Sequence, residues 1–505
     1  MTEYIVDNNK LTLTNFYNIA LNNYTVKLGD NAINRINKSR ETVEKLLKEN
    51  KVAYGITTGF GSLKDKVISN DNLEKLQHNL IESHSVGVGD PIPHHIVRGM
   101  FLLRLTCISN GNSGVRLLLA NKLVEALNKN YIPLVPEQGT VGASGDLAPL
   151  SHLILGLLGK GKAYDFDTKT YVNADIVMKK LDIQPITLHA KEGLALNNGT
   201  QFITSWTANA TYNAIRIIKL ANLIAACSIE ALHGTLNAFD ERIHNSRPHQ
   251  GQIEVAKEIR NYLSPNNIKS ESNNLHAKNK IQDAYSLRCI PQIHGVSYDM
   301  IKFIEKIIET EMNCSNDNPL VFDDDIISGG NFHAQYPAMC ADQLAYAMTL
   351  LCNNSERRLE RLVNTSLNKF MPSFLVDDPG LNSGFMIVQY ASAGITAENR
   401  TLAAPGSIHS IPTCEGAEDI VSMGGWPARK ANQVIENTYR VLALELFTAI
   451  QALEYTQEKP AEYINSIKKY VREELHVPRI MNDTYMKDYI DIVIDWLHND
   501  KIFNL

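Results

Sequence analysis

The sequence predicts a mainly α-helical protein, in which a long helical bundle follows a mixed, irregular amino-terminal part. Three long segments carry this prediction, because their apolar side chains recur at helical spacing over residues 201–232, 338–363 and 430–455. Helices of this kind reach roughly 40 Å, which is longer than one compact domain needs. We therefore expect a bundle that assembles with other subunits. Segments with the alternating pattern of β-strands are scarce.

Each long segment has its own pattern. Residues 201–232 contain no Pro or Gly and are apolar almost all round, as in a helix inside a bundle. Residues 338–363 carry an apolar stripe that includes Leu344, with the charges gathered at the far end, and residues 430–455 carry a similar stripe. By contrast, residues 1–200 hold short apolar stretches broken by Gly, Pro and Asn. We expect two domains, residues 1–200 and 201–505.

Composition excludes several classes of function. The formal net charge of -6 argues against a nucleic-acid surface, which needs a basic excess. Seven scattered cysteines without a CxxC pair are typical of reduced thiols in a cytoplasmic protein. No histidine pair has a further ligand at metal-site spacing, so no metal is expected. The amino terminus lacks a secretory pattern, and no apolar run approaches the roughly 18 residues that span a bilayer.

The segment "TVGASGDLAPLSH" at 140–152 crowds small residues immediately before Asp146. One interpretation is a helix start, with Ser144 or Asp146 as the N-cap. A second interpretation is chemical: the Gly145 nitrogen attacks the Ala143 carbonyl carbon, and a five-membered ring closes. Loss of two water molecules, one of them from the Ser144 hydroxyl, leaves an imidazolone with an exocyclic methylidene. Glycine suits this position because it has no Cβ to obstruct its nitrogen.

The run "GTVGASGDLAPLSH" resembles the signature of the methylidene-imidazolone ammonia-lyases. Seven further motifs follow that family's order and approximate spacing, and they span most of the chain: "YGITTGFG" (54–61), "SHSVGVGD" (83–90), "LALNNGTQ" (194–201), "QDAYSLRCIPQIHG" (282–295), "NDNPL" (316–320), "GGNFH" (329–333) and "EDIVSMG" (418–424). Within the family, "QDAYSLRC" and "PGLNSGFM" (379–386) are most similar to the histidine ammonia-lyases.

The resemblance implies a fold, a reaction and an assembly. The fold would be the helical one of fumarases and aspartases, with residues 201–505 forming the bundle through which a homotetramer assembles. The reaction would be elimination of ammonia from L-histidine to give trans-urocanate, the first step of histidine degradation. Its electrophile would be a 4-methylidene-imidazol-5-one formed from Ala143, Ser144 and Gly145, with no external cofactor. Each active site would draw on three subunits.

The resemblance also assigns roles to single residues. Tyr54 matches the base that takes the β-proton, which is general base catalysis in a water-poor pocket. Arg288 matches the group that binds the substrate carboxylate, a task for which a planar bidentate donor is suited. Asn198, Tyr285 and Gln282 match positions that orient the substrate amine and the ring. Phe332 matches a stacking position.

Two residues bear on the choice of substrate. In the family, a histidine at the position of His84 accompanies polar side chains, and the acid that matches Glu418 is associated with histidine. Thr57, Cys414, Ile420 and Ala334 depart from the pattern of histidine lyases. A tyrosine or other aromatic ammonia-lyase, or a 2,3-aminomutase, is therefore an alternative. A helical assembly protein without chemistry is a rival of another class, against which Tyr54, Arg288 and the intact tripeptide argue.

Overall fold

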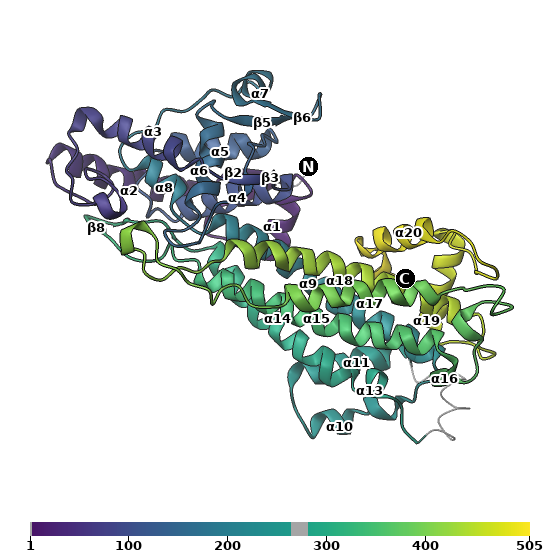
Figure 1. The fold of residues 1–505 in the computed structure, drawn as a ribbon. Coiled ribbons are helices and arrows are strands. Elements are labelled where there is room, and N and C mark those ends of the chain that lie inside the picture. Colours follow the sequence, from purple (N-terminus) through teal and green to yellow (C-terminus); the bar gives the residue numbers. More distant parts are fainter. Residues whose placement is uncertain (1–2, 264–280, 505) are drawn as a thin grey trace. The chain divides into compact units, whose positions relative to one another are not determined.

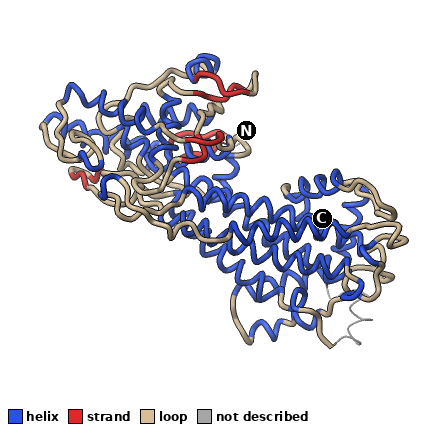
Figure 2. The backbone as a smooth tube through the Cα atoms, viewed as in Figure 1, coloured by secondary structure: helices blue, strands red, loops and turns tan. Residues whose placement is uncertain are grey.

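The computed structural model describes residues 3–263 and 281–504. Helices dominate, and strands occur as short segments, which Figure 2 draws in red. The chain divides into two compact units. Unit 1 comprises Met1–Tyr212, Ile304–Asp342 and Pro405–Asn432, and unit 2 comprises Asn213–Phe303, Gln343–Ala404 and Gln433–Leu505.

The three long helices predicted from the sequence are confirmed, and the fold is mainly helical. They are α9 (Gln201–Ala231), α15 (Gln335–Val363) and α18 (Gly425–Ala452), and Figure 1 labels each of them. A fourth long helix, α14 (Ile290–Met312), begins with an Ile-Pro pair, and proline is tolerated in a first turn because that N–H has no helical partner.

Unit 1 holds the mixed part of the chain. Its helices are α1 (Leu13–Ala20), α2 (Asp30–Lys48), α3 (Leu73–His84), α4 (His94–Ser109), α5 (Leu117–Asn128), α6 (Leu147–Leu157), α7 (Ala174–Lys180) and α8 (Glu192–Asn197). Four two-stranded sheets pair β1 (Glu3–Val6) with β2 (Thr25–Leu28), β3 (Val88–Pro91) with β4 (Pro136–Gln138), β5 (Lys162–Asp165) with β6 (Thr170–Asn173) and β7 (Leu320–Phe322) with β8 (Asp325–Ile327). Only the first of these pairs is parallel among the described strands.

Helix α4 forms the centre of unit 1. Every residue from Ile96 to Ser109 in it is buried, and it packs against α1, α2 and α5. Burying both faces of one helix removes a large apolar area from water, which is the main favourable term in folding. The arginines Arg98 and Arg104 are buried within this helix, so each needs hydrogen-bond acceptors inside the protein.

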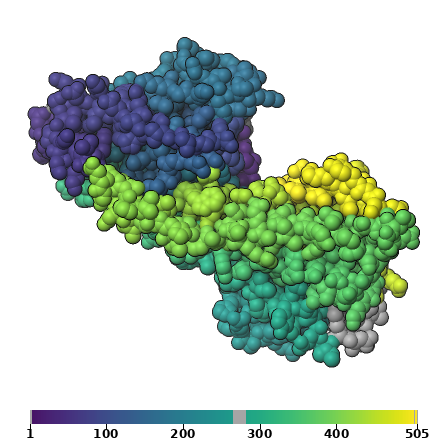
Figure 3. All heavy atoms as spheres, in the orientation of Figure 1, coloured from purple at the N-terminus to yellow at the C-terminus, as the bar shows by residue number. Residues whose placement is uncertain are grey.

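Later segments return to unit 1 and pack on its amino-terminal part. The Met423 backbone nitrogen donates to the Val141 carbonyl at 2.8 Å, and the Ser422 hydroxyl donates to the Gly142 carbonyl at 3.0 Å. Figure 3 shows the yellow-green atoms of this segment lying against purple and blue atoms of the amino-terminal part. The segment 405–432 therefore reaches the small-residue stretch at 140–146.

Unit 2 is a helical bundle. Besides parts of α9, α14, α15 and α18 it contains α10 (Glu241–Asn245), α11 (Gln250–Leu263), α13 (Tyr285–Arg288), α16 (Thr365–Asn368), α17 (Met386–Leu402), α19 (Glu462–Lys469) and α20 (Lys487–Leu497). Its core includes a fully buried ion pair, in which the Arg358 Nε lies 2.5 Å from the Glu445 Oε1. The hydroxyls of Ser228 and Ser355 also donate to this carboxylate, at 2.6 and 2.5 Å.

The compact units differ from the two domains expected from the sequence. The expected boundary at residue 200 divides the chain once, whereas unit 1 takes in two later segments, 304–342 and 405–432. The difference arises because a single cut cannot follow a chain that returns to an earlier part. Domain assignment at residue 200 stays a prediction.

Candidate functional site

The stretch before α6 forms a tight turn that depends on glycine. Gly142 and Gly145 have φ angles of +63° and +75°, a region that side chains with a Cβ rarely adopt. A Cβ on Gly145 would lie 2.3 Å from the carbonyl oxygen of Gly199 and 2.4 Å from its nitrogen. Asp146 occupies the N-cap position of α6, but its side chain makes no capping hydrogen bond there. The helix-start interpretation alone therefore leaves the run of small residues unexplained.

The turn at Asn198 and Gly199 lies directly against this stretch. The Asp146 nitrogen donates to the Gly199 carbonyl at 2.7 Å, and the Asn198 Nδ2 donates to the Ser144 carbonyl at 2.9 Å. Both contacts fix main-chain groups of the small-residue stretch at 140–146. Asn198 therefore lies beside Ser144, and its role towards a substrate stays a prediction.

Asp146 anchors the other side of the turn. Its carboxylate accepts from the Thr140 hydroxyl at 3.1 Å and from the Ile203 nitrogen at 3.0 Å, close to the start of α9. Burial raises the pKa of Asp146 to about 7, although these hydrogen bonds oppose the shift. The carboxyl is fully buried. It therefore links the tight turn to a long helix.

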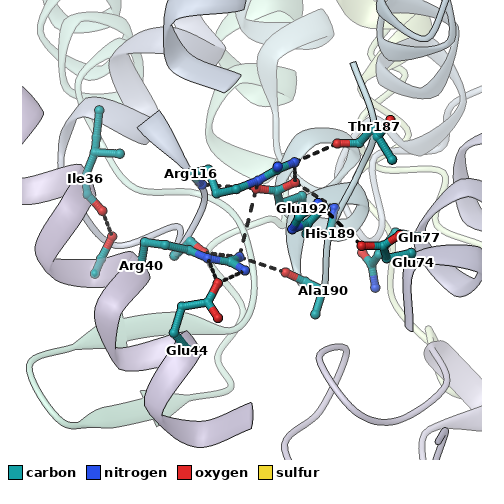
Figure 4. Close-up of polar contacts among 12 residues, drawn as sticks. Ile36, Arg40, Glu44, Glu74, Gln77, Arg116, Thr187, His189, Ala190 and Glu192 are labelled. Atoms are coloured by element: carbon teal, nitrogen blue, oxygen red, sulfur yellow. Dashed lines mark hydrogen bonds and ion pairs between the residues drawn. The ribbon is translucent and has the colours of Figure 1, made fainter. Parts of the chain in front are cut away.

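Helix α8, which ends next to Asn198, is fixed at its beginning by a buried carboxylate. Glu192 accepts from the Arg116 guanidinium at 2.8 and 2.7 Å and from the His189 nitrogen at 2.7 Å (Figure 4). The Arg40 Nη1 lies 3.9 Å from Glu192 and donates to the Ala190 carbonyl at 3.0 Å. A fully buried carboxylate is stable only when it is paired, and these two cations supply the pairing.

A second contact joins α8 to α3. The Gln77 Oε1 accepts from the Leu194 nitrogen at 3.1 Å, and Gln77 is fully buried. His84 is the last residue of α3, so this contact ties the helix that ends in His84 to the helix that ends beside Asn198. The hydrogen bond from Leu194 to Gln77 thus helps to position both His84 and Asn198.

Five predicted residues line a single cavity of about 680 Å³ in unit 1. They are Tyr54, His84, Ser144, Asn198 and Glu418. Apolar side chains, among them Leu80, Leu147 and Leu194, complete the lining. A largely apolar cavity with a few convergent polar groups is the usual form of a small-molecule site.

Glu418 contacts Ser144 inside this cavity. The Ser144 hydroxyl donates a hydrogen bond to the Glu418 Oε1, and the Thr413 hydroxyl donates to Oε2 at 2.7 Å. Thr413 and Glu418 also pair through their main chains as an isolated bridge. The acid is therefore held at both oxygens and points at the residue from which the electrophile would form.

Tyr54 and His84 are oriented by neighbouring groups. The Gly61 nitrogen donates to the Tyr54 hydroxyl oxygen at 3.3 Å, and the Ser83 Oγ lies 3.0 Å from the His84 Nδ1. Burial lowers the pKa of His84, although the charge of Glu418 opposes the shift. The imidazole is therefore neutral at pH 7 and can both donate and accept a hydrogen bond.

Six other predicted residues are not in the lining of this cavity, and two of them, Ala143 and Gly145, directly flank Ser144 in the sequence. Phe332 is half-buried in the loop before α15 in unit 1. Gln282, Tyr285 and Arg288 belong to unit 2, where Gln282 lines a separate cavity of about 580 Å³. The Arg288 guanidinium lies 4.8 Å from the centroid of the Tyr285 ring, a cation–π contact, and Tyr285 is 69% exposed.

Within the described residues, the Arg288 Nε is buried without a hydrogen-bond partner. A buried donor without an acceptor is costly, so a ligand or another chain is expected to supply one. This agrees with the carboxylate-binding role that the resemblance gave to Arg288. The role itself stays a prediction.

Several supporting residues escaped the sequence reasoning. Thr413, Gln77, Arg116 and Glu192 hold the predicted residues in place, yet none belongs to a motif with a chemical meaning of its own. The sequence does not reveal that the Glu192 carboxylate is buried beside two arginines. Arg116, for example, lies 76 residues from Glu192 in the chain.

The comparisons with known proteins decide the family. The family model for aromatic amino acid lyases matches residues 11–473. The chain belongs to the aromatic amino acid lyase family. It is accordingly a carbon–nitrogen lyase.

Curated relatives match over nearly the whole chain. Histidine ammonia-lyase of Caldanaerobacter subterraneus subsp. tengcongensis is 45% identical over 495 residues, which cover 97% of this chain and 95% of the relative. Histidine ammonia-lyase of Alkaliphilus oremlandii is 46% identical over 457 residues, which cover 90% of this chain and 89% of the relative.

Solved structures of the family share the fold. Histidine ammonia-lyase from Trypanosoma cruzi is 41% identical with a TM-score of 0.92, and the match covers 100% of this chain and 94% of that chain. Tyrosine aminomutase from Streptomyces globisporus is 33% identical with a TM-score of 0.94, and the match covers 100% of this chain and 98% of that one. The expected helical lyase fold is confirmed.

Proposed function

We propose that this chain eliminates ammonia from L-histidine to give trans-urocanate, as the first step of histidine degradation. The observation that carries the proposal is the cavity of unit 1, in which His84 and Glu418 face the same space as Ser144 and Tyr54. A neutral imidazole and a carboxylate suit the polar ring of a histidine substrate. Relatives near 45% identity over most of both chains carry the name of that activity.

The tripeptide Ala143-Ser144-Gly145 fits a 4-methylidene-imidazol-5-one electrophile that needs no external cofactor. Gly145 has no room for a Cβ beside Gly199, and its positive φ is suited to a pinched main chain. Asn198 donates to the Ser144 carbonyl, which would become the carbonyl of the ring. When formed, this group supplies an electrophile that adds to the substrate amine and makes nitrogen a better leaving group.

The residues of the chain supply the remaining chemistry. Tyr54 takes the β-proton, and Glu418 binds the imidazole and assists the proton transfer. His84 helps select a polar side chain. Asn198 holds the main chain of the reactive stretch. Arg288 binds the substrate carboxylate, Tyr285 and Gln282 orient the amine and the ring, and Phe332 stacks on the substrate.

We also infer a cytoplasmic homotetramer in which one site combines residues of three subunits. The location of Gln282, Tyr285 and Arg288 outside the lining of the unit 1 cavity supports this assembly.

None of the helices in the described residues combines the length and the apolar character that a membrane span requires. In the same residues, no group of three or more His, Cys, Asp or Glu side chains is arranged to hold a metal ion.

The alternative substrates have less support. Thr57, the departure that favoured tyrosine lyases and aminomutases, is buried, and its hydroxyl accepts from the Ala53 nitrogen at 2.9 Å. It does not line the cavity. This departure therefore has a structural role in the loop and gives no reason to prefer a phenol over an imidazole.

The test is to supply L-histidine, L-tyrosine and L-phenylalanine separately and follow the ultraviolet absorbance of each conjugated acid. We expect trans-urocanate from L-histidine at a rate far above the other two products. Conversion of L-tyrosine with none of L-histidine would overturn the proposal, and recovery of a β-amino acid would identify an aminomutase.

A further inference from the structure

We propose that Arg104 is a positioning residue that holds the Asn198–Gly199 turn against Ser144 and Gly145. The inference rests on the proposed function, because the position of this turn matters for turnover only if the tripeptide becomes the electrophile. Arg104 is fully buried in α4 and lies in none of the motifs that revealed the family.

Arg104 binds the carboxyl end of α8. Its Nη1 donates to the Ala195 carbonyl at 2.9 Å, and its Nη2 donates to the Asn198 carbonyl at 2.9 Å. The last carbonyls of a helix have no partner within the helix, and a cation there is favourable. Nη2 also donates to the Gln201 side-chain oxygen, at the start of α9. One guanidinium thus joins the end of α8 to the beginning of α9 across the turn.

All of these oxygen acceptors are neutral. Burying a guanidinium without a paired carboxylate is unfavourable, so the role of this arginine is not to form an ion pair. Two parallel donors on one rigid plane hold two carbonyls at a fixed separation, which a lysine cannot do. The contact therefore defines the geometry of the turn.

The Asn198–Gly199 turn packs directly against the segment from Ser144 to Asp146. A Cβ on Gly199 would lie 2.4 Å from the Arg104 Nη2, so the guanidinium lies immediately behind the turn. In front of it, Gly145 approaches so closely that a Cβ would lie 2.3 Å from the Gly199 oxygen. Gly145 and Gly199 form an isolated bridge, and the Asp146 nitrogen donates to Gly199. Gly199 therefore lies between the Arg104 guanidinium on one side and Gly145 on the other.

Two consequences follow for the reaction. Ring closure forms a bond between the Gly145 nitrogen and the Ala143 carbonyl carbon and releases two water molecules, one of which carries the Ser144 hydroxyl oxygen. A turn that has moved back would leave Gly145 free to relax away from Ala143. It would also move the Asn198 Nδ2 away from the Ser144 carbonyl, 2.9 Å distant. Arg104 is expected to affect both the extent of ring formation and the turnover of sites that have formed it.

The experiment compares Arg104→Lys with Arg98→Lys. Arg98 is a matched control, because it is buried in the same helix and donates to neutral acceptors, the carbonyls of Ala20, Ile19 and Leu127 at 3.0, 2.7 and 2.8 Å. For each full-length variant we would measure the fraction of polypeptide that lacks the mass of two water molecules, the near-ultraviolet absorbance of the conjugated imidazolone ring, and kcat and KM for L-histidine.

We expect Arg104→Lys to fold, to leave part of the polypeptide at its encoded mass, and to lose about tenfold or more in kcat per ring-containing site, since small displacements of a positioned group cost this much or more. Arg98→Lys should show the full mass deficit and the parent kcat. A complete deficit with unchanged kcat and KM in Arg104→Lys would overturn the inference, as would equal losses in both variants.

If Arg104→Lys does not fold, Gln201→Met provides the second test, because it removes one acceptor and keeps the arginine. A partial deficit or a lower kcat in Gln201→Met would support the inference, and parent values would overturn it. The proposed function is tested separately by the parent protein. If the parent itself showed its encoded mass, the proposed function would fail, whatever the variants do.

Discussion

The hydroxyl of Ser144 donates a hydrogen bond to the carboxylate of Glu418, although 274 residues separate them in the sequence. The contact places the acid that the family associates with histidine beside the residue from which the electrophile would form. Because Thr413 holds the second oxygen at 2.7 Å, the carboxylate has a defined orientation in the cavity. Ser144 and Glu418 therefore line the same cavity.

Glu418→Gln should lower kcat/KM for L-histidine by about 10²-fold or more, because the variant loses the charge that binds the imidazole and assists proton transfer. Its mass deficit should remain. Steady-state kinetics on L-histidine measure the loss. Glu415→Gln is the control, since Glu415 lies in the same loop and is exposed. Equal kinetics of the parent and Glu418→Gln would contradict the assignment of this acid.

Tyr54→Phe should reduce kcat by roughly 10²- to 10⁴-fold, because the base that takes the β-proton is removed while the cavity keeps its shape. Binding of the product should change little, and inhibition by added trans-urocanate measures it. Pre-steady-state formation of product at the parent rate in this variant would show that another group takes the proton.

His84→Phe should shift the preference from L-histidine towards L-phenylalanine. The neutral imidazole of His84 is a hydrogen-bonding group in the lining of the cavity, and a phenyl ring in its place would favour an apolar substrate instead. The ratio of the two kcat/KM values measures the shift. An unchanged ratio would mean that His84 does not contact the substrate side chain.

Glu192→Gln should destabilise unit 1 by about 3–5 kcal/mol, because the fully buried carboxylate that pairs with Arg116 and lies near Arg40 becomes a neutral amide. Glu44→Gln is the matched control: it removes the other carboxylate that contacts Arg40, but its side chain is 46% exposed, so a cost below about 1 kcal/mol is expected. Urea unfolding of both variants provides the comparison. Similar midpoints would show that the Glu192 contacts add little.

Asp146 should give the stability a characteristic pH dependence. Burial raises its pKa to about 7, whereas an unfolded aspartate titrates near 4. Between these values the folded chain keeps a proton that the unfolded chain has released, so this group's contribution to stability falls as pH rises from about 4 to about 7 and then levels off. Above pH 7 the term is constant.

Asp146→Asn removes this titration. We would measure the unfolding temperatures of the parent and the variant from pH 5 to pH 8. The unfolding temperature of the parent should fall relative to that of the variant as pH rises towards 7. The two curves therefore draw together if the variant is less stable at low pH, and diverge if it is more stable there. Parallel curves would contradict the raised pKa.

The sequence predicted the long helices well, because α9, α15 and α18 each carry an apolar pattern that local spacing reveals. It could not predict that residues 405–432 return to the amino-terminal unit, since this depends on contacts between distant segments. The motifs found Tyr54, His84, Ser144, Asn198 and Glu418, which share one cavity. They could not find Arg104, because a buried arginine among apolar residues has no local signal that distinguishes it from Arg98.

The central claim is that Ala143, Ser144 and Gly145 have cyclised, and the mass of the intact parent chain tests it most directly. The account predicts a mass below the encoded value by two water molecules, with the whole deficit located in the peptide that contains residues 143–145 and absent from Ser144→Ala. An encoded mass for that peptide in active parent protein would contradict the account.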